Sequence, residues 1–327
     1  MLELDEQVIT ETDVLSAERN FSFSEIKPEI KLFNLNYDDA DFYIYGLTNV
    51  VYSGETEFQR VLIADSLNYG RILCLDGEIQ SAEADEELYH ELLVQPAMVL
   101  HPNPRRVLIV GGGEGASLRE VLRSRTVETV TMVDLDSKMI ELSKEHLGAW
   151  HRGSFNDPRV NLVISEGRGF ITNDTAKYDV VIIDVVDLEE DGPAKAIYTR
   201  EFYQLLKARL APGGVIAVQA MEFSHLDHKM HSLLTRTLKA VFSEVHSYHA
   251  VVPSFLCDWA FIVASDWFNP KKMSPKAFDD VLASRVGSGV LKHLDGEFFL
   301  SCFHFSKTAR EKLAEAGPVM QDSESSQ

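Results

Sequence analysis

The residues with the clearest chemical meaning lie in a glycine-rich loop, GGGEGA, at residues 111–116. Glycines at this spacing between a strand and a helix allow a tight turn and let a ligand approach the backbone closely. In nucleotide sites such a loop faces phosphate with its backbone N–H groups. Glu114, however, places a carboxylate in the middle of the loop, where it would repel phosphate. The loop therefore favours a ligand that carries a positive charge.

Acidic residues also end three neighbouring apolar, strand-like runs: Asp134 and Asp136, Glu166 (beside Gly167), and Asp184 and Asp187. Asp134 follows the glycine loop by roughly 20 residues, the spacing at which an acid accepts hydrogen bonds from both ribose hydroxyls. One such acid alone is typical of a helix cap or a solvated surface group. Four strand ends with carboxylates instead predict one site, for a ligand with a nucleoside and a positive charge.

Glu114 also separates the nucleoside ligands that could fill this site. NAD explains only the first two strand ends, whereas methyl transfer from S-adenosylmethionine explains three. The carboxylate of that cofactor would lie close to the loop, and two like charges at ~4 Å cost about 4 kcal/mol at an effective dielectric constant of about 20. Without this carboxylate the remaining ammonium is attracted instead. The loop therefore favours decarboxylated S-adenosylmethionine, whose transferable group is aminopropyl.

The elements that must position these residues fall into two regions. Residues 43–82 contain short alternating or β-rich runs, with Asp76-Gly77 as a strong hairpin signal, and residues 85–100 carry apolar side chains at helical spacing. From residue 105 apolar, β-branched runs alternate with amphipathic segments, which predicts a mostly parallel sheet covered on both faces. We therefore expect an α/β fold: a doubly wound, Rossmann-like domain of the S-adenosylmethionine-dependent transferase type, preceded by a small β-hairpin-rich N-terminal domain.

The expected domain boundaries follow from these patterns. We assign an N-terminal extension without clear periodicity, a β-rich domain with its connecting helix, a Rossmann-like transferase domain, and a polar C-terminal tail, at residues 1–34, 35–103, 104–316 and 317–327. The last eight residues, MQDSESSQ, have the composition of a disordered segment.

Composition narrows the partners and the compartment. With 51 acidic against 31 basic residues, the net charge of −20 argues against nucleic acid and is compatible with a cationic ligand. Three scattered cysteines suit a reducing cytoplasm, the acidic first residues do not resemble a signal peptide, and no apolar run approaches the roughly 20 residues of a membrane-spanning helix. We expect a soluble, cytoplasmic protein that acts without a membrane.

Three histidines at i, i+3, i+6 spacing, His225, His228 and His231, invite a metal interpretation. They lack an acidic or cysteine partner pattern, so we interpret them as a solvated helix start and expect no metal site.

Longer motifs resemble one family, the polyamine aminopropyltransferases (spermidine and spermine synthases). They include LDGEIQSAEADEELYHE at 75–91, HPNPRRVLIVGGGEGASLREVL at 101–122, the acids of IIDVVD, IYTREFY, and VPSFLCDWAFIVASD at 252–266, and the similarity runs from about Tyr43 to Leu313. Within the family the chain is most similar to thermospermine synthases. It shares with them the GGGEG loop, VPSF followed by a tryptophan, and four residues between Asp187 and Gly192-Pro193.

The resemblance implies a role for each matching residue. Nine residues would bind the aminopropyl donor: Gln59, His90, Gly111, Gly113, Glu114, Asp134, Glu166, Gly167 and Pro193. Five would bind the polyamine, with the first also the catalytic acid/base: Asp184, Tyr89, Asp187, Gln219 and Phe255. The implied co-substrate is decarboxylated S-adenosylmethionine, with no prosthetic group, and the implied assembly is a homodimer or homotetramer.

Three departures from the family pattern bear on the acceptor. DVVDL lacks the usual proline after its second acid, Glu166 replaces the usual aspartate, and Phe255 replaces a tyrosine that contacts putrescine in spermidine synthases. We therefore expect spermidine as acceptor, giving thermospermine or spermine, with putrescine as the alternative. The rival interpretations are a small-molecule methyltransferase and a catalytically silent polyamine-binding protein.

Overall fold

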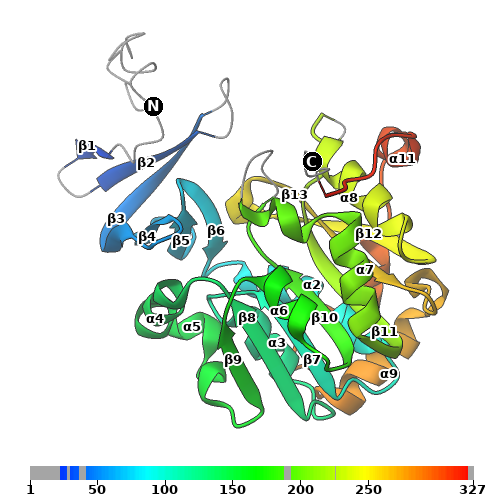
Figure 1. Ribbon diagram of the computed structural model, residues 1–327. Coiled ribbons are helices and arrows are strands. Elements are labelled where there is room, and N and C mark those ends of the chain that lie inside the picture. The colour runs from blue at the N-terminus through cyan, green and yellow to red at the C-terminus, as the bar shows by residue number, and fades with distance from the viewer. Residues whose placement is uncertain (1–22, 28–29, 37–41, 188–192, 225, 323–327) are drawn as a thin grey trace, which may run out of the picture. The chain divides into compact units, whose positions relative to one another are not determined.

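The computed structural model describes residues 23–27, 30–36, 42–187, 193–224 and 226–322, and the chain divides into two compact units, Met1–Ala84 and Asp85–Gln327 (Figure 1). Each unit has a sheet of its own, with six strands in the first and seven in the second. This confirms the predicted α/β class with a separate β-rich N-terminal region.

The smaller unit is an antiparallel sheet whose strands lie in sequence order: β1 (Phe23–Lys27), β2 (Ile30–Asn36), β3 (Phe42–Glu55), β4 (Arg60–Ser66), β5 (Gly70–Leu75) and β6 (Glu78–Ala82). As predicted, Asp76 and Gly77 make the hairpin turn between β5 and β6. Both have positive φ, 49° and 98°, as a two-residue turn of matching twist requires.

Strands β1 and β2 correct one expectation, since we had interpreted residues 1–34 as an extension without regular structure. Residues 23–27 and 30–36 instead pair as an antiparallel hairpin, and β2 continues the sheet along β3. The alternation in these strands is weak, so their structure depends on pairing with a strong neighbour. Residues 1–22 lie outside the described part of the chain.

The larger unit is built on a sheet in the order β12-β13-β11-β10-β7-β8-β9. Its strands are β7 (Arg106–Gly111), β8 (Thr129–Asp134), β9 (Val160–Ile164), β10 (Tyr178–Asp184), β11 (Leu210–Glu222), β12 (Glu244–Val252) and β13 (Cys257–Ser265). Five strands are parallel, and β13 is antiparallel to both of its neighbours. The chain order reverses between β7 and β10, which makes a crevice at the carboxyl ends of these two strands.

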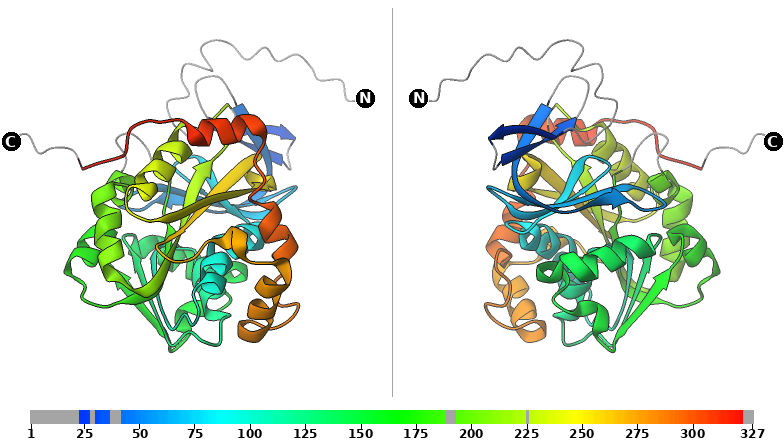
Figure 2. Two further views of the ribbon diagram at one scale, coloured as in Figure 1. Left: turned by 90° about the vertical axis from the view of Figure 1, so that its right-hand side faces the viewer. Right: turned by 90° about the vertical axis from the view of Figure 1, so that its left-hand side faces the viewer.

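Helices cover both faces of this sheet, as the unbroken apolar strands require. One face packs against α2 (Glu86–Leu100), α3 (Ala116–Leu122), α9 (Pro275–Arg285) and α10 (Gly296–Ser301). The other face packs against α6 (Gly167–Asn173), α7 (Arg200–Arg209) and α8 (Lys229–Lys239). The left view of Figure 2 shows α2 in cyan and α9 in orange on one side, with α7 in green on the other.

The remaining helices lie at the edges of the larger unit: α4 (Ser137–His146), α5 (Gly148–His151) and α11 (Lys307–Ala314). Short 3-10 helices occur at Ser154–Asn156, Pro193–Ile197, Pro253–Phe255 and Pro270–Lys272. No helix among the described residues combines the length and the apolar character needed to cross a bilayer.

Helix α2 belongs to the larger unit, whereas we had grouped it with the small β-rich domain. Its apolar residues from Leu92 to Leu100 lie in the same core cluster as strands β7, β8, β10 and β11. The helix is buried nearly all round, so it is a core element rather than a connector.

The polar tail also differs from its expectation of disorder. Met320 packs against the α6–α8 core cluster, its carbonyl accepts a hydrogen bond from the Arg200 N–H, and Asp322 forms an ion pair with Arg168 of α6. Its backbone N–H groups at residues 320 and 322 bond to α8 and α7. Residues 323–327 lie outside the described part of the chain.

Candidate active site

The crevice between β7 and β10 brings the glycine loop against Asp184. Gly111 and Asp184 are register partners at the ends of the two strands, and the N–H of Gly112 donates to the Asp184 carbonyl at 2.7 Å. A Cβ on Gly111 would lie 2.1 Å from that carbonyl oxygen, and both glycines have positive φ. Only glycine allows this approach, so the loop sequence and the position of the carboxylate depend on each other.

The carboxylate of Asp184 is held by two hydroxyl groups. Ser117 Oγ of α3 donates to Oδ2 at 2.6 Å, and the Tyr89 hydroxyl of α2 donates to Oδ1 at 3.3 Å. Burial and the negative charge of Glu114 raise the pKa of Asp184 to about 6, against the opposing effects of His90 and the two hydroxyls. The group is therefore an anion at neutral pH that is basic enough to accept a proton.

Glu114 lies against His90, its neighbour across the crevice. Glu114 Oε1 is 3.0 Å from His90 Nε2, and the other ring nitrogen, Nδ1, is 2.6 Å from the carbonyl oxygen of Glu86. Burial alone would lower the pKa of His90, but hydrogen bonds to Glu114 and Glu86 outweigh it and raise the pKa to about 10. The cationic partner of Glu114 is a finding that the sequence analysis did not predict.

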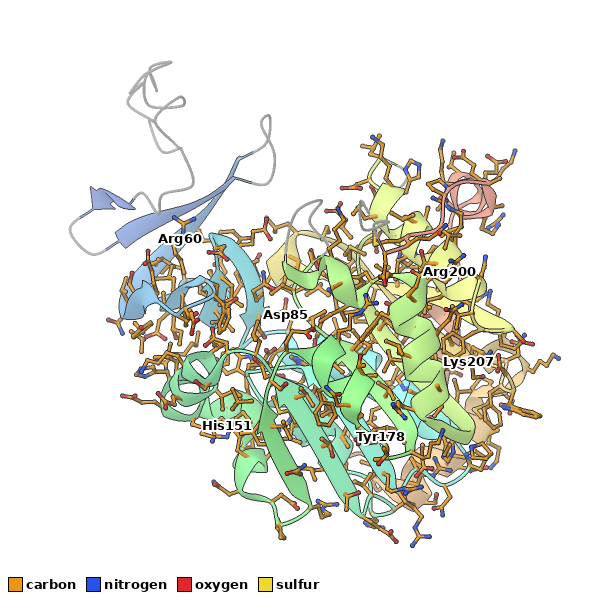
Figure 3. All side chains as sticks on the ribbon, in the orientation of Figure 1. Arg60, Asp85, His151, Tyr178, Arg200 and Lys207 are labelled. Atoms are coloured by element: carbon orange, nitrogen blue, oxygen red, sulfur yellow. The ribbon has the colours of Figure 1, made fainter. Side chains whose placement is uncertain are left out.

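Tyr89 stands at the end of an aromatic wall. Its ring lies edge-on to Phe255 at 5.9 Å and to Phe261 at 5.3 Å between centroids, and Phe255 in turn meets Trp259 at 4.8 Å. Asp85, labelled in Figure 3, holds this wall in place because its carboxylate accepts both the N–H and the hydroxyl of Ser254. The 3-10 turn that carries Phe255 is thereby fixed to the start of α2.

Asp187, three residues beyond Asp184, is held by a neutral amide. Gln219 Nε2 of β11 lies 3.0 Å from Asp187 Oδ1, 2.7 Å from the Val185 carbonyl and 3.1 Å from the Tyr198 hydroxyl. Gln219, which we expect to line a polyamine channel, is buried, with 2% of the residue exposed, and that role stays a prediction. Its observed contacts position the segment after β10.

The second strand end separates two acids that the sequence could not distinguish. Asp136 is the N-cap of α4, since its side chain accepts the Met139 N–H at 3.0 Å. Asp134 faces the glycine loop, where a Cβ on Gly113 would lie 3.1 Å from its Oδ2. Burial and the charges of Asp136, Glu114 and Asp184 raise the pKa of Asp134 to about 6, although the N–H of Asp136 donates to it.

The third strand end shows that Glu166 caps a helix. Its two carboxylate oxygens accept the N–H groups of Arg168 and Gly169, at 2.7 and 2.6 Å. Gly167 packs so closely that a Cβ there would lie 2.8 Å from Val110 of β7. The acid that we selected for a ligand contact therefore has a structural use as well.

Two other candidates are described only by their own surroundings. Gln59 lies in the smaller unit, in the turn between β3 and β4, where its carbonyl accepts the Thr56 N–H. Pro193 begins the 3-10 helix Pro193–Ile197, and its side chain falls outside the described part of the chain. Their assignments to the donor stay predictions.

The same cluster has the composition of a possible metal site. Among the described residues, His90, Glu114 and Asp184 offer ligand atoms that lie within 4.8 Å of one another. Both ring nitrogens of His90 are engaged in hydrogen bonds, however, and a metal ligand needs a free lone pair on one of them. The arrangement suits an organic cation better than a metal ion.

The histidines near α8 correct another interpretation. His231 is fully buried and its Nδ1 lies 2.8 Å from the Ala220 carbonyl, so it is a core residue rather than part of a solvated helix start. Burial lowers its pKa to about 4. His228 directly precedes α8, and His225 lies outside the described residues.

Sequence reasoning missed several residues that shape the site: Ser117, Glu86, Arg119, Tyr198 and Trp259. Ser117 follows the glycine loop by two residues, which is a local signal. The others lie within motifs quoted for the family resemblance, but their contacts are with elements far apart in the chain, and these the sequence does not show.

Comparisons with known proteins agree with this geometry. A family described as the spermine/spermidine synthase domain matches residues 86–272, and one described as the spermidine synthase tetramerisation domain matches residues 38–83. These ranges lie within the larger and the smaller unit, respectively.

Curated relatives and solved structures support the same family. The chain is 54% identical to polyamine aminopropyltransferase 2 of Pseudomonas aeruginosa over 87% of this chain and 82% of the relative. It is 42% identical to the polyamine aminopropyltransferase of Aeropyrum pernix over 82% and 86%. Crystal structures of spermidine synthase from Thermotoga maritima, and of a spermidine synthase with the transition-state analogue AdoDATO, each match with a TM-score of 0.78 at 28% identity, over 91% of this chain and 98% of theirs. The chain therefore belongs to the spermine/spermidine synthase family of transferase enzymes.

Proposed function

We propose that the protein transfers the aminopropyl group of decarboxylated S-adenosylmethionine to an amine of spermidine and releases methylthioadenosine. The observation that carries the proposal is the placement of Asp184, a carboxylate with a raised pKa, between the glycine loop and the hydroxyl of Tyr89. Family membership and the names of the relatives support the transfer.

The donor is assigned to the glycine-loop side of the crevice. Asp134 receives the ribose, and Gln59, Glu166, Gly167 and Pro193 surround the nucleoside as the family resemblance implies. Gly111 and Gly113 leave room for the donor because they carry no side chain. Glu114, oriented by His90, binds the ammonium of the aminopropyl group together with Asp184.

Chemistry at Asp184 begins with the acceptor amine, which attacks only when it is unprotonated. Free amines of this kind have pKa values near 10.4, so a base has to accept a proton as the attack begins. The amine displaces the thioether from the methylene group beside the sulfonium, the C–S bond breaks, and methylthioadenosine leaves as a neutral molecule. Much of the rate comes from holding amine and methylene in line within ~3.5 Å.

We choose spermidine over the shorter putrescine because further acidic residues lie beyond Asp187. Burial and then the negative charges of Glu222, Asp187 and Asp258 raise the pKa of the Cys257 thiol, which also bonds Glu222. Glu222 is the register partner of Trp259, so the two side chains share one face of the sheet next to the aromatic wall. A row of acids that continues past Asp187 suits spermidine, which carries one more amine than putrescine. Thermospermine or spermine is then the product.

Assembly and location are proposed from the smaller unit and from the cysteines. The smaller unit matches a tetramerisation domain, which supports a homodimer or homotetramer formed through it. The three cysteines are free thiols, as expected in the cytoplasm. Light scattering of the full chain measures the assembly directly.

The experiment is a product assay with matched tubes. The protein is incubated with decarboxylated S-adenosylmethionine and putrescine, spermidine or agmatine, and products are identified by mass spectrometry and chromatography, which separates thermospermine from spermine. An Asp184→Asn variant serves as the control for background transfer. Product from spermidine alone supports the proposal. Product mainly from putrescine would instead assign putrescine as the acceptor.

Two further outcomes contradict the enzyme assignment. Donor and polyamine binding without release of methylthioadenosine indicates a silent binding protein. Methylated product from intact S-adenosylmethionine indicates the methyltransferase rival.

A further inference from the structure

A chain of buried charged side chains runs from the glycine loop into the core of the larger unit. His90 bonds Glu114 on one side and Glu86 on the other, and Glu86 is gripped by Arg119 of α3 through two bonds, at 2.7 and 2.9 Å. Arg119 Nε in turn donates to Glu120 at 2.9 Å. Positive and negative side chains therefore alternate along this hydrogen-bonded row, from Glu114 to Glu120.

Arg119 and Glu120, at the buried end of this hydrogen-bonded row, are held by further bonds. Arg119 also donates to the Trp150 carbonyl at 2.6 Å, and Glu120 is shared with Arg123 and with the amide of Gln95. Burial by itself would raise the pKa of Glu86, but bonds to His90 and Arg119 lower it to about 2. A carboxylate bonded at both oxygens to a planar guanidinium has little rotational freedom.

Two hydrogen bonds and the charge of the Glu86 carboxylate, whose Oε2 lies 3.2 Å from Nδ1, together keep the ring of His90 protonated. Nδ1 faces the Glu86 carbonyl oxygen, which can only accept, so Nδ1 carries a proton. Nε2 lies 3.0 Å from Oε1 of Glu114, and the hydrogen bonds to Glu114 and Glu86 raise the pKa of His90 to about 10. His90 is therefore an imidazolium whose plane is set by the core, and its Nε2–H sets the position of Glu114.

The positive charge of His90 also acts on Asp184. The groups that face Asp184 are Glu114 of the glycine loop, Tyr89 and His90 of α2, Ser117 of α3, and Asp134 of β8, with Asp187 along its own segment. Apart from His90, the ionised members of this set are acids. Without the imidazolium, the negative charge of Glu114 would raise the pKa of Asp184 further.

We propose that Glu86 and Arg119 are positioning residues for the aminopropyl transfer, because through His90 they orient the carboxylate of Glu114 beside Asp184. Neither residue touches the substrates. The inference rests on the proposed function for its kinetic consequence, but the chain of bonds itself can be measured without any reaction.

The test compares two identical substitutions on one helix. Glu86→Gln removes the charge next to His90, whereas the control Glu91→Gln changes another buried acid of α2, which bonds the N–H groups of residues 292–294 away from the site. For each folded variant, kcat, the KM for the donor and the pH profile of kcat/KM are measured. NMR of the ring nitrogens of His90 is recorded in the same samples.

Glu86→Gln is expected to raise the donor KM about tenfold, to move the acid limb of kcat/KM to higher pH by about one unit, and to turn the His90 ring neutral near pH 8. The limb moves up because loss of the imidazolium raises the pKa of Asp184. Glu91→Gln is expected to leave the limb and the ring signals of His90 in place, whatever it does to stability.

The second variant, His90→Gln, covers the case in which Glu86→Gln fails to fold. It keeps a hydrogen-bond donor for Glu114 without the charge, and it is expected to move the acid limb in the same direction. A folded Glu86→Gln or His90→Gln enzyme with the wild-type acid limb and donor KM overturns the inference while the proposed function stands. A neutral His90 ring in the wild type near pH 8 overturns it too, and an inactive wild type with an imidazolium signal overturns only the proposed function.

Discussion

On the glycine-loop side of Asp184 the acid Glu114 is bonded to a cation, whereas on the β11 side Asp187 is held by the neutral amide of Gln219. A carboxylate paired with an imidazolium has a fixed direction but attracts a further cation less strongly. The amide of Gln219 donates to Asp187 without neutralising its charge as a cation would. The difference suggests that the donor end recognises its ligand mainly by geometry and the acceptor end mainly by charge.

Asp184 belongs to both ends, so its loss gives the largest effect. Asp184→Asn is expected to lower kcat/KM by about 10³-fold, since it removes the proton acceptor and one of the anions that bind the amines. Methylthioadenosine release measures the loss, and the circular dichroism spectrum should match that of the wild type. A folded variant with more than a tenth of the activity would show that another group accepts the proton.

The pH profile tests the same carboxylate without a mutation. The pKa of Asp184 is raised to about 6, and the base must be unprotonated, so kcat/KM is expected to fall about tenfold per pH unit below pH 6 and to level off above it. The profile of kcat/KM for the donor, which reports the free enzyme, measures the limb. A limb near pH 4 would mean that the carboxylate titrates like an exposed one.

Charge recognition at the acceptor end predicts a change of selectivity. Glu222→Gln is expected to raise the KM for spermidine about tenfold and to leave that for putrescine within about twofold, because only the longer amine reaches Glu222. Glu244→Gln on β12, whose acid bonds His246, is the matched control. Equal effects on the KM of both amines would show that Glu222 does not recognise the additional amine of spermidine.

The smallest effect is expected at the aromatic wall. Phe255→Tyr adds a hydroxyl near Tyr89 and Trp259 without changing the ring packing, and it is expected to improve kcat/KM for putrescine by about threefold. Competition between putrescine and spermidine in one tube gives this ratio accurately. A drop in putrescine use would show that the hydroxyl has no amine to meet.

Local signals in the sequence predicted much of the framework. The glycine loop, the hairpin at Asp76-Gly77 and the acids at strand ends depend on residues close together in the chain, and the structure has them where they were expected. The doubly wound arrangement also followed from apolar runs alternating with amphipathic ones. Type and order of elements are encoded locally, so one sequence is enough to read them.

What the sequence could not predict depends on contacts between distant segments. Glu86 and Arg119 are an ordinary acid and an ordinary base until α2 and α3 meet. The hydrogen bonds of Gln219 to Val185 and Asp187 form only because β11 pairs with β10. Glu166 could be either a ligand contact or a helix cap, and its local sequence fits both. Which side chains contact each other depends on the tertiary structure, and an amphipathic pattern in the sequence does not reveal it.

The backbone pairing of Gly111 with Asp184 limits how the substrate specificity of such an enzyme can change. Asp184 stands at the end of a central strand and cannot shift without breaking the ladder that also holds the glycine loop. Under the proposed function, new acceptors are reached by exchanging side chains around a stationary carboxylate, at positions such as 222 and 255. The sheet keeps the position of Asp184 constant, whereas the residues that contact the acceptor amine are free to vary.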